Sequence, residues 1–231
     1  MTRLSIIVPV YNEQATIIPI LEAVSAQQVP GVELETIVIN DGSTDDTAAR
    51  IEQRPELYAK FVNLSQNGGK GAAVKAGLAV ASGEFILFQD ADLEYSPSEY
   101  AKLMAPVLEY NADLVIGSRF IAPQCTRVFY FWNKVGNRLI TLVFNLLNNT
   151  TFTDIYSCYL LYRRELVPVD QLRTEGWEQH AEILSLATSK GTSLFEVPIS
   201  YFGRTFEEGK KIRARHAILV LLTIVKCRLF R

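Results

Sequence analysis

The sequence predicts one α/β domain with a mainly parallel sheet and helices on both faces. Short apolar runs rich in Ile and Val, such as Leu4–Val10 and Leu34–Asn40, have the composition of strands that are buried on both faces. Segments with helical periodicity separate these runs, so strand and helix alternate through the first half of the chain. With 231 residues, of which 48% are hydrophobic, the chain is long enough for one large core.

The expected elements follow in regular order up to residue 118. Between the two runs, an apolar stripe at helical spacing predicts a helix over 15–27. Ser96 and Pro97 are typical of a helix N-cap and a first helical position, and they predict a helix directly after them. The other elements expected here are helices over 46–53 and 70–81 and strands over 61–64, 84–89 and 112–118.

The second half of the chain is less regular. Residues 131–147 combine an apolar stripe (Val135, Leu139, Leu142, Leu146) with a basic and polar stripe (Lys134, Arg138, Thr141, Asn145), which predicts an amphipathic helix. A strand is expected over 154–163, a helix over 177–190 and a last strand over 193–200, which Pro198 confines to a sheet edge or a bulge. We expect residues 1–203 to form the catalytic part and 204–231 a basic tail with an amphipathic helix, within the same domain.

Charge is unevenly distributed along the chain. The net charge of −2 predicts no nucleic-acid partner, but residues 204–231 hold eight basic and two acidic residues. The apolar run Ala217–Val225 has nine residues, whereas crossing a bilayer takes about 20. A basic helix of this kind favours a place in the membrane interface, and a core or dimer-contact helix is the alternative. With no signal peptide and three widely spaced cysteines, we expect a cytoplasmic protein, peripheral at the inner face of the membrane.

Three acidic residues follow the strand expected over 84–89. In extended geometry the carboxylates of Asp90 and Asp92 point to one side, and Ala91 points away. Crowded carboxylates repel unless a cation joins them, and Mg²⁺ or Mn²⁺ shared with a ligand's phosphates suits such oxygen ligands. Glu94 is placed as a third ligand or as a neighbour of the ligands. Acids that form a turn or sit before a helix are the alternative, and the D-x-D motif alone does not decide between them.

Polar loops follow the other expected strands and should meet these acids, because ligands of open parallel sheets bind outside the carboxyl ends of the strands. Asp41 in "NDGSTDDT" is placed to bind a base or ribose, although a plain helix-capping loop has the same residue types. Lys70 in "NGGKGAAVKAG" is placed to reach a phosphate at a helix N-terminus. The chain has neither a G-x-x-x-x-G-K-[ST] nor a G-x-G-x-x-G motif. A nucleotide held by these loops and by a metal at its diphosphate fits better.

These motifs carry a family resemblance. "SIIVPVYNE", "VINDGSTDDT", the stretch over 67–97 and "GSRF" resemble the family 2 glycosyltransferases of the GT-A fold, and within them the dolichol-phosphate and polyprenyl-phosphate mannose synthases. The resemblance implies a nucleotide-diphospho-sugar donor and a divalent cation, Mg²⁺ or Mn²⁺. The nucleotide-sugar residues that we expect are Pro9, Tyr11, Glu13, Asp41, Lys70, Asp90, Ala91 and Asp92, and the metal ligands are Asp90, Asp92 and Glu94.

The second half indicates the acceptor. A transferase that uses a sugar hydroxyl needs a carboxylate base, whereas a lipid phosphate is already an anionic nucleophile and needs cations to hold it. This half supplies cations and lacks the E-D pair and the Q-x-x-R-W motif of hydroxyl-using family members. Some of these cations are expected to be ordinary solvated charges. We expect Arg119, Lys134, Arg138, Arg204 and Lys210 at the acceptor phosphate, and Asp92, Arg119, Arg204 and Lys211 in catalysis.

The expected reaction is an inverting, metal-dependent transfer of a hexose to a polyprenyl or dolichyl phosphate. The resemblance implies mannose from GDP-mannose. A UDP-sugar donor, glucose or N-acetylhexosamine, and a saccharide hydroxyl acceptor are the enzymatic alternatives. A non-catalytic nucleotide-sugar-binding subunit of a glycosylation complex is the alternative from another class, and a homodimer or a membrane-protein partner is compatible with each.

Overall fold

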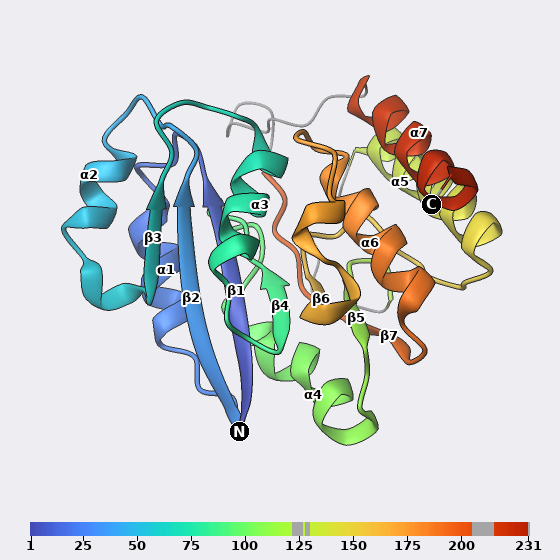
Figure 1. The fold of residues 1–231 in the computed structure, drawn as a ribbon, viewed down its shortest axis with the longest axis horizontal. Helices are drawn as coiled ribbons and strands as arrows, with labels where there is room; N and C mark the ends of the chain where they lie inside the picture. Colours follow the sequence, from blue (N-terminus) through green and yellow to red (C-terminus); the bar gives the residue numbers. More distant parts are fainter. Residues whose placement is uncertain (122–126, 128–129, 205–214, 231) are drawn as a thin grey trace.

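The fold is built on one seven-stranded sheet. The structure is a computed structural model that describes residues 1–121, 127, 130–204 and 215–230 (Figure 1). The strand order is β3-β2-β1-β4-β6-β5-β7. Among the described strands, β6 runs antiparallel to β4 and β5, and the other neighbouring pairs are parallel. The expected α/β fold with a mainly parallel sheet is confirmed.

The elements have the following bounds. The strands are β1 (Thr2–Val10), β2 (Val32–Asn40), β3 (Lys60–Asn63), β4 (Phe85–Phe88), β5 (Leu114–Ser118), β6 (Leu160–Arg163) and β7 (Leu194–Pro198). The helices are α1 (Ile17–Ser25), α2 (Thr47–Glu52), α3 (Lys70–Val80), α4 (Tyr100–Tyr110), α5 (Phe131–Asn148), α6 (Gln179–Lys190) and α7 (Arg215–Phe230). Short 3-10 turns are η1 (Pro55–Leu57), η2 (Pro97–Glu99), η3 (Arg164–Leu166) and η4 (Val169–Gln171).

Helices cover both faces of the sheet, so its central strands are buried on each side. In Figure 1, α3 and α6 lie in front of the sheet and α1 lies behind it. α3 packs against β1 and β2, α6 packs against β6, and α4 packs against β5 and β7. Continuous apolar strands suit this double cover, and residues 4–8 of β1 and 36–40 of β2 are buried throughout. The carboxyl ends of β1, β2 and β4 therefore meet at one edge of a rigid sheet.

Pro198 has the position that its chemistry predicts. It is the last residue of β7, which lies at the edge of the sheet and pairs in parallel with β5. A proline has no amide hydrogen for a ladder bond and is tolerated at such an edge.

The strand expected over 154–163 is wrong in its first six residues, because β6 begins only at Leu160. Residues 154–159 form a loop whose polar groups bind other parts of the molecule. The Cys158 amide donates to the Tyr95 hydroxyl at 3.2 Å, and the Tyr159 carbonyl accepts from the Gly117 amide at 2.8 Å. These contacts replace the regular ladder that the apolar sequence pattern suggested.

The apolar stripe of α5 faces outward. Leu139, Leu142 and Leu146 are 53%, 54% and 75% exposed, whereas Ile140 and Phe144 are buried. α7 packs against both α5 and α6 and exposes Ile218 and three leucines, Leu219, Leu222 and Leu229. No helix within the described part of the chain is long and apolar enough to cross a membrane.

Candidate active site

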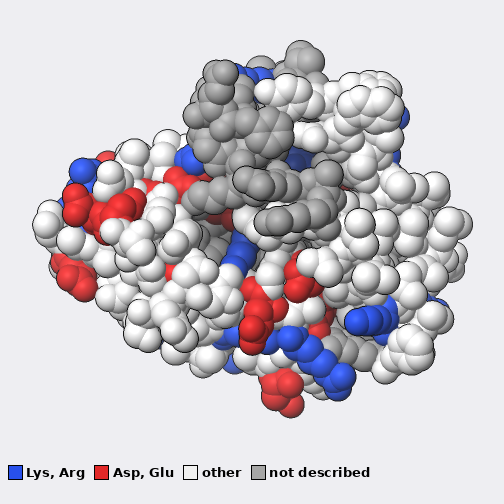
Figure 2. Space-filling model, turned by 90° about the horizontal axis from the view of Figure 1, so that it is seen from above, with Lys and Arg blue, Asp and Glu red and all other residues white. Residues whose placement is uncertain are grey.

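A cavity of about 720 Å³ lies where the sheet's carboxyl ends meet α5, α6 and α7. It is lined by most of the residues that the sequence predicted for the site: Pro9, Tyr11, Glu13, Asp41, Lys70, Asp90, Ala91, Asp92, Glu94, Arg119 and Arg204. Figure 2 shows acidic and basic side chains together in the middle of this side of the molecule. The strand ends thus bring side chains from distant parts of the sequence into one space.

The first two loops hold each other in place. The Thr44 amide donates to Asn12 Oδ1 at 2.8 Å, and the Asn12 amide donates to the Ser43 hydroxyl at 3.0 Å. Asp41 is buried, and its carboxylate accepts from the amides of Gly68 and Gly69 at 2.9 and 3.0 Å. Burial raises the pKa of Asp41, and the two amide donors offset only part of that effect. Asp41 therefore fixes the glycine-rich loop as well as lining the cavity.

Gln89 organises the acidic loop that follows β4. Its side-chain oxygen accepts from the hydroxyls of Tyr100 and Tyr159 at 2.7 and 2.8 Å. Its amide nitrogen donates to the carbonyls of Asp90 and Tyr95 at 3.0 and 3.2 Å. A fully buried side chain thereby ties together both ends of the acidic loop.

The acids do not sit on an extended strand, which corrects the geometry expected from the sequence. β4 ends at Phe88, and the chain turns through Leu93, whose φ is 63°. Asp90 and Asp92 nevertheless line the same cavity. Burial together with the charges of Asp90 and Glu94 raises the pKa of Asp92 to about 7. A carboxylate whose proton affinity is raised by neighbouring carboxylates is a suitable ligand for a divalent cation.

Lys70 is paired with Asp90. Its Nζ lies 2.5 Å from Asp90 Oδ1 and 5.2 Å from the centre of the Trp177 ring. Burial opposes the charged form of Asp90, but the Lys70 ammonium outweighs it and lowers the pKa of Asp90. The lysine at the start of α3 therefore reaches the acids directly.

Glu94 binds Tyr201 and Arg204, which lie in the segment after β7. Its carboxylate accepts from the Tyr201 hydroxyl and, at 2.6 Å, from the Arg204 amide. The Arg204 guanidinium donates to the Asp92 carbonyl at 2.9 Å and forms an ion pair with Glu13 at 3.2 Å. Among the described residues, no group of three or more His, Cys, Asp or Glu side chains is arranged to hold a metal ion. Glu94 as a metal ligand stays a prediction.

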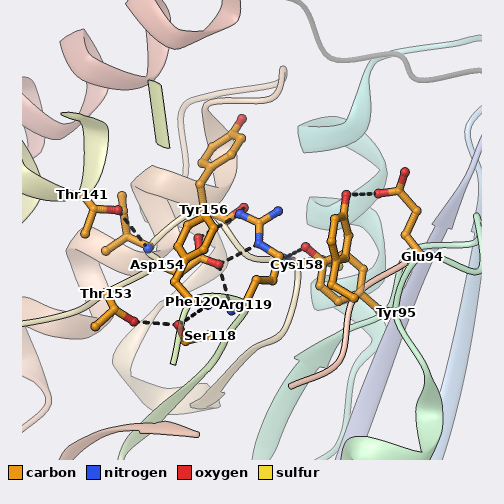
Figure 3. A network of polar contacts seen from close by, with 12 residues as sticks. Glu94, Tyr95, Ser118, Arg119, Phe120, Thr141, Thr153, Asp154, Tyr156 and Cys158 are labelled. Carbon is orange, nitrogen blue, oxygen red and sulfur yellow. Dashed lines mark hydrogen bonds and ion pairs between the residues drawn. The ribbon is translucent and has the colours of Figure 1, made fainter. Parts of the chain in front are cut away.

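Arg119 is held by a buried ion pair. Its Nε and Nη2 donate to the two oxygens of Asp154 at 2.6 and 2.8 Å, and Nη2 also donates to the Tyr156 carbonyl at 3.1 Å (Figure 3). Arg119 is 8% exposed and Asp154 is fully buried. The guanidinium lies over the Tyr201 ring, 5.1 Å from its centre. This bidentate contact fixes the orientation of Arg119 at the cavity wall.

The other expected cations are not part of the cavity as described. Lys134 and Arg138 occupy exposed positions of α5 and do not line it. Lys134 lies over the Phe120 ring, 5.7 Å from its centre. Lys210 and Lys211 lie outside the described residues.

Several residues that line the cavity were not predicted for it, and most lie before or on α6: Tyr156, Ser157, Cys158, Trp177, Gln179, His180 and Tyr201. The glycine-rich loop brings α6 close, because the Gly71 amide donates to the Glu175 carbonyl at 2.7 Å. A Cβ on Gly71 would lie 2.5 Å from the Glu175 carbonyl carbon, so this position requires glycine. Glycines at 68, 69 and 71 allow such a close approach, but the sequence does not identify its partner.

A mainly parallel sheet with paired acids, a lysine and oriented arginines at its carboxyl edge has the architecture of a nucleotide-sugar transferase. The family model described as Glycosyl transferase family 2 matches residues 5–168, and the chain belongs to this family. The resemblance expected from the sequence is confirmed.

Curated relatives extend the match. The undecaprenyl-phosphate 4-deoxy-4-formamido-L-arabinose transferase of Enterobacter sp. (strain 638) is 28% identical over 214 residues, which cover 90% of this chain and 62% of that protein. The transferase of the same name from Photorhabdus laumondii subsp. laumondii is 27% identical over 237 residues, which cover 98% of this chain and 70% of that protein. The chain thus spans less than two thirds of the first relative's length.

Solved structures share the fold. Glucosyl-3-phosphoglycerate synthase from Mycobacterium tuberculosis, in complex with Mn²⁺, UDP and phosphoglyceric acid, matches with a TM-score of 0.73 and 22% identity over 100% of this chain and 80% of that chain. Its complex with Mg²⁺ and UDP matches with a TM-score of 0.70 and 22% identity over 98% and 79%. The likeness confirms the GT-A fold.

Proposed function

We propose that this chain transfers a sugar from a nucleoside diphosphate to a polyprenyl phosphate. The observation that carries the proposal is that Arg119 and Arg204 line the same cavity as Asp90 and Asp92. Cations for an acceptor anion thus face acids that suit the metal of a donor diphosphate. The names of the curated relatives, which contain undecaprenyl phosphate, support the same class of acceptor.

The reaction needs no general base. A phosphate oxygen of the acceptor attacks the anomeric carbon, and the bond from that carbon to the donor diphosphate breaks on the opposite face, so the configuration inverts. Arg119 is oriented to hold the acceptor anion, and Lys70 is placed to contact the leaving diphosphate. The electron pair leaves with the diphosphate, and no proton is transferred.

The paired acids fit a bound Mg²⁺ or Mn²⁺. Asp90 and Asp92 would hold the ion with hard carboxylate oxygens, together with oxygens of the donor diphosphate. When bound, the ion would supply charge neutralisation of the leaving diphosphate. Glu94 already accepts from Tyr201 and Arg204, so we assign it to positioning the Arg204 segment beside the metal site.

The outward faces of α5 and α7 support attachment to a membrane surface. Both helices expose apolar side chains, and α7 also carries the exposed basic residues Lys226 and Arg228. Figure 2 shows mostly uncharged surface toward the end of the molecule where these helices lie. We infer that the protein sits at the cytoplasmic face of a membrane, where a lipid phosphate is presented.

Incubation of the protein with labelled donors and matched acceptors tests the proposal. GDP-mannose is the donor that the resemblance implies, and UDP-sugars form the second set because UDP is the nucleotide in the neighbours' crystals. We expect transfer to undecaprenyl phosphate, none to undecaprenol, and loss of activity with a chelator. Transfer to a free saccharide would overturn the proposal. So would the absence of any transfer in a sample that binds the nucleotide. Thermal shift with GDP or UDP, with and without Mn²⁺, checks nucleotide binding independently.

A further inference from the structure

One wall of the cavity comes from two helices, α5 and α7, and is mainly apolar, although Asn133, Asn137 and His216 also line it. Trp132, Gly136 and Ile140 recur at every fourth position of α5, on one side of the helix, and all three line the cavity. Ala217 and Val220 line it from α7, which packs against α5. The cavity therefore has a charged part at the strand ends and a mainly apolar part between these helices.

Gly136 is a glycine that packing does not require. It stands within α5, where glycine destabilises a helix relative to alanine. A Cβ built on Gly136 meets no atom of the described residues within 4 Å. Gly77 of α3 is the opposite case, because a Cβ there would lie 2.6 Å from an Ile39 side-chain atom and 2.9 Å from one of Ile7. A side chain at 136 would therefore occupy open space in the cavity rather than clash with the core.

The same two helices lead from the cavity to an apolar outer surface. Leu139 and Leu142 of α5 and Ile218 and Leu222 of α7 are all at least half exposed. An exposed apolar surface of this kind marks contact with a membrane or a partner. An apolar chain that leaves the cavity between α5 and α7 would therefore emerge at an apolar surface.

We propose that the space beside Gly136 is the subsite for the first isoprene units of the acceptor lipid, and that the absence of a side chain at 136 keeps it open. The inference rests on the proposed function, in which the acceptor is a lipid phosphate. The phosphate of such a lipid would bind beside Arg119, and its apolar chain would lie along α5. Isoprene units in this space would bury apolar surface against Ile140 and Trp132. Gly136 is therefore a position that determines acceptor specificity.

A graded series at this position provides the test. Gly136→Ala and Gly136→Leu are compared with the wild type for the KM of undecaprenyl phosphate and for the Kd of farnesyl phosphate by calorimetry. We expect a small increase with alanine and an increase of about tenfold in both constants with leucine, because the added side chain fills the subsite. Thermal stability should be equal or higher, and the Kd for the nucleotide with Mn²⁺ should not change.

Two controls separate this effect from general damage. Glu109→Leu adds a leucine to an exposed position of α4, a helix that does not line the cavity, and should leave all constants unchanged. Inorganic phosphate should bind the leucine variant as it binds the wild type, because it lacks the chain. The subsite is refuted if Gly136→Leu binds farnesyl phosphate with the wild-type Kd. It is also refuted if the Kd for the nucleotide rises as much as the Kd for farnesyl phosphate. If the leucine variant does not fold, the same comparison is made with the alanine variant. A wild type that binds the nucleotide with Mn²⁺ but no lipid phosphate refutes the proposed function itself and the subsite with it.

Discussion

The Lys70 ammonium lies 2.5 Å from Oδ1 of Asp90. A side chain from the start of α3 therefore forms an ion pair with a carboxylate that we propose as a metal ligand. A divalent cation that approaches Asp90 must compete with this ammonium for the same carboxylate. The lysine therefore weakens binding of a cation alone, while it favours a cation that arrives with a diphosphate to which Lys70 can turn. This arrangement would couple metal binding to donor binding.

Replacing Lys70 should separate the two binding events. In Lys70→Met we expect Mn²⁺ without nucleotide to bind several-fold more tightly at pH 8, because the competing charge is gone. The KM of the donor should rise at the same time, because the diphosphate loses a cationic partner. Mn²⁺ binding can be followed by electron paramagnetic resonance. Lys75→Met on the same helix is the control, and weaker Mn²⁺ binding by Lys70→Met would contradict the competition.

Replacing Asp92 should remove activity and stabilise the fold. Asn has the same shape and can still accept from the Glu94 amide, which lies 3.1 Å from Asp92 Oδ1, but it cannot neutralise a cation. We expect Asp92→Asn to lower transfer by about 100-fold or more. Because burial raises the pKa of Asp92 to about 7, the ionised side chain destabilises the folded state above that pH.

The stability of this variant therefore depends on pH in a defined direction. The gain in melting temperature of Asp92→Asn should be largest at pH 8. It should shrink as the pH falls from about 7 towards the ordinary value of 3.8 and vanish below that value, where the wild-type side chain is protonated in both states. A metal-free sample is needed for this comparison. A variant that keeps full, chelator-resistant transfer would remove Asp92 from the metal site.

The order of strands and helices in the first half could be predicted because each element depends on local patterns. Continuous Ile and Val runs indicated buried strands, and the rule that ligands bind at the carboxyl ends of strands brought Asp41, Lys70 and Asp90 into one site. The loop over 154–159 could not be predicted. Its conformation depends on contacts such as Tyr95 with Cys158, which join residues 63 positions apart.

Tyr201 shows why part of the site was missed. Nothing in its immediate sequence distinguishes it from a buried aromatic residue, and its position depends on Glu94, which is 107 residues away in the chain. Lys134 and Arg138 show the converse case. Both lie on a helix as expected, but at these two positions α5 faces solvent rather than the cavity. A residue's side of a helix follows from packing, which the spacing of one segment does not determine.

The ion pair between Arg119 and Asp154 should be necessary for folding. Removing one partner leaves a buried charge without compensation, which typically costs about 3–5 kcal/mol. We expect Asp154→Ala to lower the free energy of unfolding in urea by about that amount. Glu22→Gln is the matched control, because its ion pair with Arg54 is exposed and should contribute about 0–1 kcal/mol. If both substitutions lowered the free energy of unfolding equally, burial would not determine how much the Arg119–Asp154 ion pair contributes to stability.

The Tyr201 hydroxyl should matter for the acceptor more than for the donor. In Tyr201→Phe the ring stays beside Arg119, but the hydrogen bond to Glu94 is lost. Because Glu94 then holds the Arg204 segment by one contact fewer, we expect a higher KM for undecaprenyl phosphate and an unchanged Kd for the nucleotide. Tyr110→Phe serves as the control, since Tyr110 stacks on Phe195 at the exposed end of α4. A change confined to nucleotide binding would place Tyr201 with the donor instead.

Glu35, which does not line the cavity, should make the free energy of unfolding depend on pH. Its carboxylate accepts from the Ser5 hydroxyl at 2.5 Å, from the Lys60 ammonium at 2.8 Å and from the Ser82 amide at 2.9 Å. Burial raises the pKa of Glu35, but these donors outweigh it and lower the pKa to about 2, compared with 4.5 ordinarily. The ionised form is therefore the one that stabilises the fold. This contribution is complete above about pH 5 and is lost as the pH falls towards 2.

Glu35→Gln should consequently unfold more easily at pH 7, with a free energy of unfolding lower by about 3 kcal/mol, since each pKa unit corresponds to about 1.4 kcal/mol. The difference from the wild type should narrow as the pH falls below 4.5, because the wild type then loses the same contribution. Urea unfolding of both proteins at several pH values between about 7 and 3.5 measures this difference in the free energy of unfolding. Glu33→Gln, on the same strand but paired with Arg3 in an exposed position, should show little change at any of these pH values. A difference between Glu35→Gln and the wild type that stays constant with pH would mean that packing, and not the charge of Glu35, is responsible.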